Sequence, residues 1–152
     1  MSKKFWILVI AAFVVINEIL VDWLLAIFVG DYGVAEGFID VTRYLTVDSL
    51  LFAAGFRAIP YGALLLVGLT TRLKHTIPGK LALWLALLAI AAIHFWGYWA
   101  MQYSFYTPDY TSSTSSLELI FVPIHALWIG AITGGIGFVL ATFGIRSLKR
   151  LN

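Results

Sequence analysis

The segment LALWLALLAIAAIHFWGYWAMQ at Leu81–Gln102 contains no Asp, Glu, Lys or Arg and is apolar over nearly its whole length. A helix needs about 20 such residues to cross the hydrocarbon core of a bilayer. Comparable segments occur at Phe5–Phe28, Ser49–Leu69 and Leu117–Ile145. None of them alternates apolar and polar residues with the period of two that a transmembrane strand requires. The sequence therefore predicts an all-α integral membrane protein, with four transmembrane helices bundled into a single domain over residues 1–152.

The composition agrees with a lipid environment. Hydrophobic residues make up 61% of the chain and charged residues 12%, which is about half the charged share of a soluble domain. A globule of 152 residues cannot hide that much apolar surface from water, so lipid is expected to cover the remainder. The absence of cysteine excludes disulfides, thiolate metal sites, iron–sulfur clusters and cysteine nucleophiles.

The basic residues predict the orientation in the membrane. Eight of them fall at one set of span ends, and only Arg43 falls at the other. By the positive-inside rule, we expect a multi-pass protein of the plasma (inner) membrane with both termini cytoplasmic. A basic stripe with interleaved aromatic residues is absent, so no nucleic-acid partner is expected. The eight are Lys3, Lys4, Arg72, Lys74, Lys80, Arg146, Lys149 and Arg150.

Two further elements are expected on the outer side. Between Gly33 and Thr46, apolar residues recur at helical spacing, which predicts a short helix lying in the outer interface. The Ser-Thr-Ser-Ser run at 113–116, followed by Glu118, predicts an N-terminal cap for the fourth helix. The basic start and long apolar run of Phe5–Phe28 are interpreted as an uncleaved first helix rather than a signal peptide.

Each predicted span carries ionisable residues. With a rise of about 1.5 Å per residue, Glu18, Arg57, His94 and His125 all lie roughly 12–15 Å from the outer end of their spans, near the midplane. Pairs spaced four apart share a helix face, which adds a second polar residue to three of the spans. We therefore predict that the helices bury a common polar cluster, consisting of Glu18, Asp22, Arg57, Tyr61, His94, Tyr98 and His125.

One interpretation of this cluster is structural. Arg57 would neutralise Glu18 or Asp22, and the histidines would fix the helix register by hydrogen bonds. The chain would then be a subunit of a larger membrane complex, an assembly partner or a homo-oligomer, with no catalytic residue. The small residues Gly130, Gly134 and Gly137 permit close helix packing, more often within one chain than between chains.

Other functions stay open from the sequence. Carboxylates and histidines at mid-membrane depth are typical of proton or cation pathways, here through a polar cavity opening outward. His94 and His125 could ligate a b-type haem from its two faces, and together with Glu18 they could bind a divalent metal. A lipid-modifying enzyme would use Glu18 with one of these histidines. No G-x-S-x-G or H-E-x-x-H motif occurs, which weighs against an enzyme.

Overall fold

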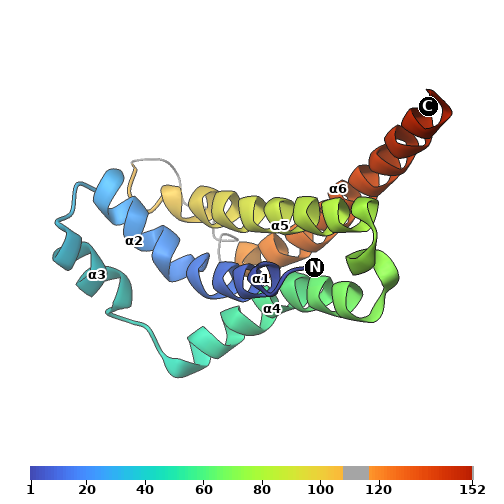
Figure 1. The fold of residues 1–152 in the computed structure, drawn as a ribbon. Coiled ribbons are helices and arrows are strands. Elements are labelled where there is room, and N and C mark those ends of the chain that lie inside the picture. Colours follow the sequence, from blue (N-terminus) through green and yellow to red (C-terminus); the bar gives the residue numbers. More distant parts are fainter. Residues whose placement is uncertain (108–116, 152) are drawn as a thin grey trace.

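The computed structural model describes residues 1–107 and 117–151, and this part of the chain is helical with no strand. The predicted all-α fold is confirmed, and the predicted cap at 113–116 lies outside the described residues. The elements follow the chain in the order shown in Figure 1. They are α1 (Lys3–Val15), α2 (Glu18–Phe28), α3 (Val34–Thr42), α4 (Val47–Thr70), the 3₁₀ helix η1 (Arg72–His75), α5 (Ile77–Tyr103) and α6 (Glu118–Leu151).

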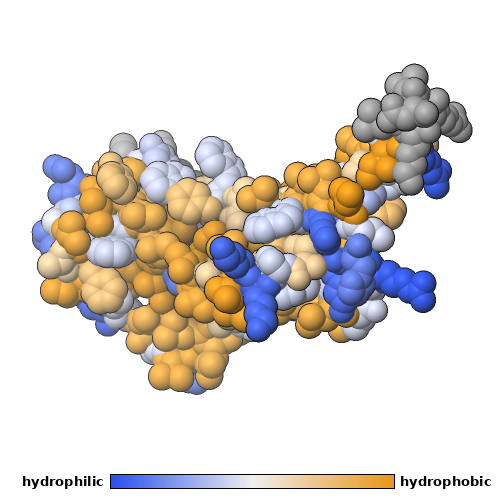
Figure 2. Space-filling view, viewed as in Figure 1, coloured by the Kyte–Doolittle hydropathy of each residue, from blue (hydrophilic) through white to orange (hydrophobic). Residues whose placement is uncertain are grey.

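Three helices, α4, α5 and α6, are long and apolar enough to cross a membrane, and the pair α1 and α2 would make a fourth, broken span. Apolar side chains cover most of the face in Figure 2, with hydrophilic side chains gathered in separate groups. This surface suits a membrane protein, because soluble monomers rarely expose such continuous apolar area.

The prediction of one continuous first helix is wrong. α1 and α2 are bent by 61° relative to each other, and the helix is interrupted at Ile16 and Asn17. Asn17 is the reason: its Oδ1 accepts from Leu20 N at 2.8 Å, and its Nδ2 donates to Val14 O at 2.8 Å. Asn favours the N-cap position because its side chain satisfies an otherwise unpaired N–H of the first turn. Asn17 therefore starts a new helix inside a segment whose other residues are mostly apolar.

The short helix predicted between Gly33 and Thr46 is present as α3. It packs on α2, where a Cβ on Gly37 would come within 3.2 Å of Ala26 Cβ. Trp23 on α2 donates from Nε1 to Val34 O at 2.9 Å and packs edge-on against Phe38. α3 is thus tied to the second half of the broken span.

α5 begins four residues before the predicted Leu81. Thr76 is its N-cap and accepts from Gly79 N at 3.2 Å, so the Pro78-Gly79 pair lies inside the first turn rather than in a loop. Proline suits this turn because its missing N–H has no helical partner there. Gly79 is required, since a Cβ would lie 2.2 Å from Leu73 O.

The longest helix, α6, packs along α5 through small residues. A Cβ on Gly130 would lie 2.6 Å from Ile90 Cγ1, and one on Gly137 would lie 2.3 Å from Leu85 Cδ1. The glycine spacing therefore serves a contact within the chain. The last turns of α6 project beyond the other helices (Figure 1).

The buried apolar residues form two clusters. The first joins α1, α4, α5 and α6 and contains Phe5, Leu64 and Leu87. The second joins α2, α5 and α6 and contains Val21 and Leu25. Arg57, His94 and Gln102 are the buried polar residues of the described chain, and Tyr61 of the first cluster and Tyr98 of the second flank His94.

Candidate functional site

The break in the first span is held by Arg57 of α4. Its Nε donates to Phe13 O at 3.1 Å, and its guanidinium forms an ion pair with Glu18. The guanidinium also lies over the Phe13 ring, 5.1 Å from the ring centroid. The Arg57 and Glu18 side chains are only 9% and 13% exposed, so the pair is largely desolvated.

Both charges of the pair match the helix ends that they face. Phe13 lies in the last turn of α1, where carbonyls lack intrahelical partners and carry partial negative charge. Arg57 brings a positive charge to this end, and Glu18 brings a negative charge to the first turn of α2. The break therefore adds favourable helix-dipole interactions to the ion pair.

A polar stripe on α5 faces this break. His94, Tyr98 and Gln102 are spaced four apart and therefore share one helix face. Gln102 donates from Nε2 to Glu18 O at 3.1 Å, which joins the stripe to the start of α2. Tyr106 lies in the turn just beyond α5, and its hydroxyl donates to Asp22 Oδ1 at 2.9 Å.

The His94 end of the stripe is aromatic. The His94 ring stacks on Tyr61 of α4, with centroids 5.2 Å apart, and lies 5.7 Å from the Tyr98 ring. The Tyr98 hydroxyl lies near both charges of the Arg57–Glu18 pair without a hydrogen bond of good geometry. Polar side chains thus extend from Tyr106 and Asp22 through the break to Tyr61. We name this set the polar column; it consists of Glu18, Asp22, Arg57, Tyr61, His94, Tyr98, Gln102 and Tyr106.

Four buried polar atoms of the polar column have no hydrogen-bond partner within the described chain: the Tyr61 and Tyr98 hydroxyls, His94 Nε2 and Gln102 Oε1. His94 Nδ1 lies 2.8 Å from Ile90 O, which can only accept, so Nδ1 carries the proton and a neutral ring presents a lone pair at Nε2. Buried groups without partners cost about 1–3 kcal/mol each and call for an explanation. These two hydroxyls and two acceptor atoms are suited to hydrogen bonds with water or with another proton donor.

Sequence reasoning missed Gln102 and Tyr106. The four-residue spacing from His94 and Tyr98 leads directly to Gln102 and would have identified it. Tyr106 follows the helix end at Tyr103, where helical spacing no longer applies. Of the two acids predicted to neutralise Arg57, Glu18 forms the ion pair, and Asp22 bonds Tyr106 instead.

The predicted inward position of His125 is wrong. Its side chain is exposed, and its Nδ1 contacts Phe121 O at 2.8 Å. The face of α6 that packs on α5 carries Val122, Ala126 and Gly130, and His125 lies to one side of that face. The position of a residue along a helix does not determine which way its side chain points. In α6, the small residues that pack on α5 determine how the helix is rotated.

This position removes the support for the two cofactor hypotheses. His94 is fully buried and His125 points outward, so the two rings do not oppose across a haem. Among the described residues, no three His, Asp or Glu side chains are grouped as metal ligands, so the set Glu18, His94 and His125 is not assembled.

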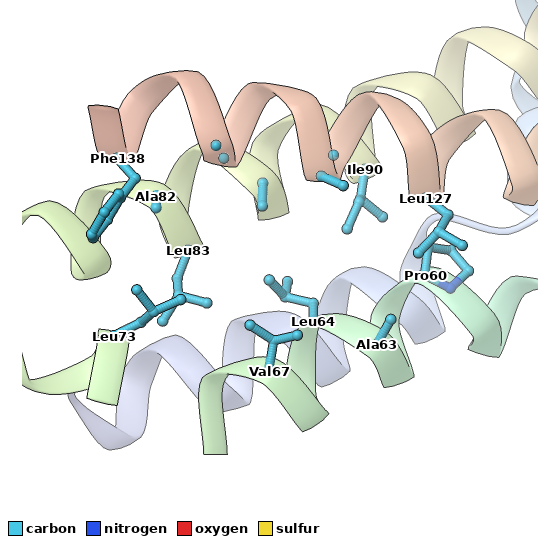
Figure 3. A pocket seen from close by; sticks show the side chains of 15 residues that line it. Pro60, Ala63, Leu64, Val67, Leu73, Ala82, Leu83, Ile90, Leu127 and Phe138 are labelled. Atoms are coloured by element: carbon cyan, nitrogen blue, oxygen red, sulfur yellow. The ribbon is translucent and has the colours of Figure 1, made fainter. Parts of the chain in front are cut away.

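The structure also contains an apolar cleft of about 420 Å³ between α4 and α6, with α5 as its floor (Figure 3). We expected a polar cavity opening to the outer side. This cleft is a different feature, because its lining is apolar and it runs from Pro60 to Leu73 in η1, so it does not test the predicted polar cavity.

No protein-family model, curated protein or solved structure matches the chain.

Proposed function

We propose that the chain is a multi-pass protein of the plasma (inner) membrane, with α1 and α2 together forming a broken first span. Both termini and η1 would lie on the cytoplasmic side, and α3 would lie in the outer interface. The apolar surfaces of α4, α5 and α6 support the embedding. The eight basic residues at one set of span ends support the orientation.

Single cysteines test this topology cleanly, because the chain has none of its own. Tyr44→Cys replaces an 86% exposed residue after α3, and His75→Cys replaces an exposed residue in η1. An impermeant thiol reagent should label Tyr44→Cys in intact cells and His75→Cys only after permeabilisation. The reverse pattern would refute the orientation, and labelling of both in intact cells would refute the two-sided topology.

For the polar column we propose proton binding, with uptake from the outer side. The observation that carries this is a set of four polar atoms without a hydrogen-bond partner among the described residues, beside a largely buried carboxylate and a buried imidazole. Carboxylates and histidines at such depth are the usual parts of proton relays, and breaks in membrane helices are where transporters build their ion sites. His94 to Gln102 spans eight residues, or about 12 Å of helix.

The column would deliver a proton only to mid-depth. Beyond Tyr61 and His94, on the side of the basic loop, the core consists of apolar residues such as Leu64, Leu83 and Leu87. A proton taken up from outside would therefore be held near Glu18 and His94. Onward transfer would need a second half-pathway, supplied by another copy of the chain or by a partner subunit in a larger membrane complex.

Infrared difference spectra of the reconstituted protein between acidic and neutral pH test this proposal. We expect a carboxylic acid band that is lost in Glu18→Gln, and imidazole bands that are lost in His94→Gln. His75→Gln is the matched control, because His75 is exposed and outside the column. Spectra unchanged in both column variants would refute proton binding.

A purely structural role is the second candidate, and the complete Arg57–Glu18 pair favours it. Arg57 and Asn17 bind the carbonyls of Phe13 and Val14 at the end of α1, and the Asn17 side chain also caps Leu20 N in the first turn of α2. In that case the chain would act as an assembly partner or subunit. Glu18→Gln would then lower thermal stability while leaving the infrared bands and proton uptake in liposomes unchanged.

A further inference from the structure

The apolar cleft between α4 and α6 lies apart from the polar column. α4 contributes Pro60, Leu64 and Val67, and α6 contributes Gly134, Gly135 and Phe138 (Figure 3). Several of these residues are partly or largely exposed, so the cleft opens sideways between the two helices. In a membrane, such an opening faces lipid.

The lining determines what can fill the cleft. Every lining side chain is apolar, so a water molecule inside would find no side-chain partner. An empty space would leave the lining atoms without van der Waals contacts. A flexible aliphatic chain from the surrounding bilayer satisfies both conditions.

The charges around the inner end of the cleft select the headgroup. Leu73 lines this end and lies between Arg72 and Lys74 in η1, and Lys80 follows at the start of α5. Arg72 and Lys80 are exposed, and residues 69–80 include no carboxylate. Basic groups between helices on the cytoplasmic side are suited to lipid phosphates.

We propose that this cleft binds one acyl chain of an anionic phospholipid, whose phosphate contacts the basic groups Arg72 and Lys80. The inference rests on the proposed membrane embedding and is independent of proton binding. It gives α6 a lipid-filled contact with α4 in addition to its direct contacts with α4 and α5. The lipid would be drawn from the leaflet on the side of η1.

Gly135→Phe is the direct test, because a Cβ at Gly135 meets no atom within 4 Å and the ring would occupy the cleft. Gly144→Phe is the matched control, since Gly144 also lies on α6 in open space but outside the cleft. The purified protein in mild detergent is titrated with phosphatidylglycerol or phosphatidylcholine, and adducts are counted by native mass spectrometry.

We expect one phosphatidylglycerol per chain, with affinity lowered about tenfold or more in Gly135→Phe and unchanged in Gly144→Phe. The double variant Arg72→Gln/Lys80→Gln keeps the cleft intact and should also lose about tenfold, from two surface charges. Equal binding of phosphatidylcholine, or no effect of Gly135→Phe, overturns the proposal. So does self-association that Gly135→Phe abolishes while lipid binding persists, because the occupant would then be a second chain. The cysteine labelling described above tests the embedding separately.

Discussion

Arg57 and Glu18 are 39 residues apart in sequence and form a buried ion pair at the point where the first span breaks. The pair joins α4 to the start of α2, and Arg57 also binds the carbonyl of Phe13 near the end of α1. One arginine thus connects both halves of the broken span to a third helix. The bend of 61° is maintained by this connection together with the Asn17 cap.

Arg57→Gln should lower the free energy of unfolding by about 3–5 kcal/mol, because it leaves the Glu18 carboxylate buried without its partner. The double variant Glu18→Gln/Arg57→Gln should recover part of this loss. Chemical unfolding in detergent measures both. Arg43→Gln is the control, since its pair with Asp40 is exposed and should be worth less than about 1 kcal/mol. Equal losses for Arg57→Gln and Arg43→Gln would contradict a structural role for the buried pair.

Asn17→Ala should destabilise the protein by about 1 kcal/mol, because it removes the side-chain cap of α2. Ser2→Ala provides the comparison: Ser2 occupies the N-cap position of α1, but its side chain makes no capping bond, so its loss should change little. Thermal unfolding of Asn17→Ala and Ser2→Ala under the same conditions compares the two losses of stability. A stable Asn17→Ala protein would mean that Arg57 alone maintains the break.

Gly130→Ala and Gly135→Ala should have opposite effects, although both residues lie on α6. A Cβ at Gly130 would lie 2.6 Å from Ile90 Cγ1, whereas a Cβ at Gly135 meets nothing within 4 Å. Alanine at Gly135 should stabilise the helix by up to about 1 kcal/mol, and alanine at Gly130 should overpack the α5 contact at a cost of about 1–3 kcal/mol. Unfolding midpoints that shift together would show that α6 does not pack on α5 through this face.

The helices α4, α5 and α6 could be predicted from the sequence because each is an apolar run longer than a bilayer requires. The break in the first span was not predicted, because the apolar run was long enough to be interpreted as one helix despite Asn17 and Glu18. Asn17 followed by Glu18 is an ordinary helix-start signal, and the contact with Arg57 makes it effective inside an apolar segment.

For the candidate site, the sequence predicted which residues could meet but not how each helix is rotated. Glu18, Arg57 and His94 meet because each lies on the packed face of its helix. His125 was predicted at a comparable depth, but the packed face of α6 is set by its glycines, and only the contact with α5 reveals which face that is. Gln102 was visible in the spacing, whereas Tyr106 joins through a turn that no periodicity describes.

Tyr106 makes its end of the polar column sensitive to alkaline pH. Burial and the adjacent Asp22 carboxylate, which accepts its hydrogen bond, raise the pKa of Tyr106 above its usual value. A proton that the folded state binds more tightly stabilises the fold fully below the unfolded tyrosine pKa of about 10. That contribution is lost as the pH rises from about 10 through the raised pKa of the folded state.

Tyr106→Phe removes both the hydrogen bond and this titration. The variant should therefore be less stable than the unchanged protein near neutral pH, and its unfolding midpoint should fall less between about pH 8 and about pH 11. Tyr44→Phe is the control, because Tyr44 is 86% exposed and should leave the alkaline slope unchanged. Thermal unfolding of the three proteins across this range provides the comparison. If Tyr106→Phe keeps the full alkaline slope, the Tyr106–Asp22 bond does not stabilise the folded state, and the polar column ends at Gln102.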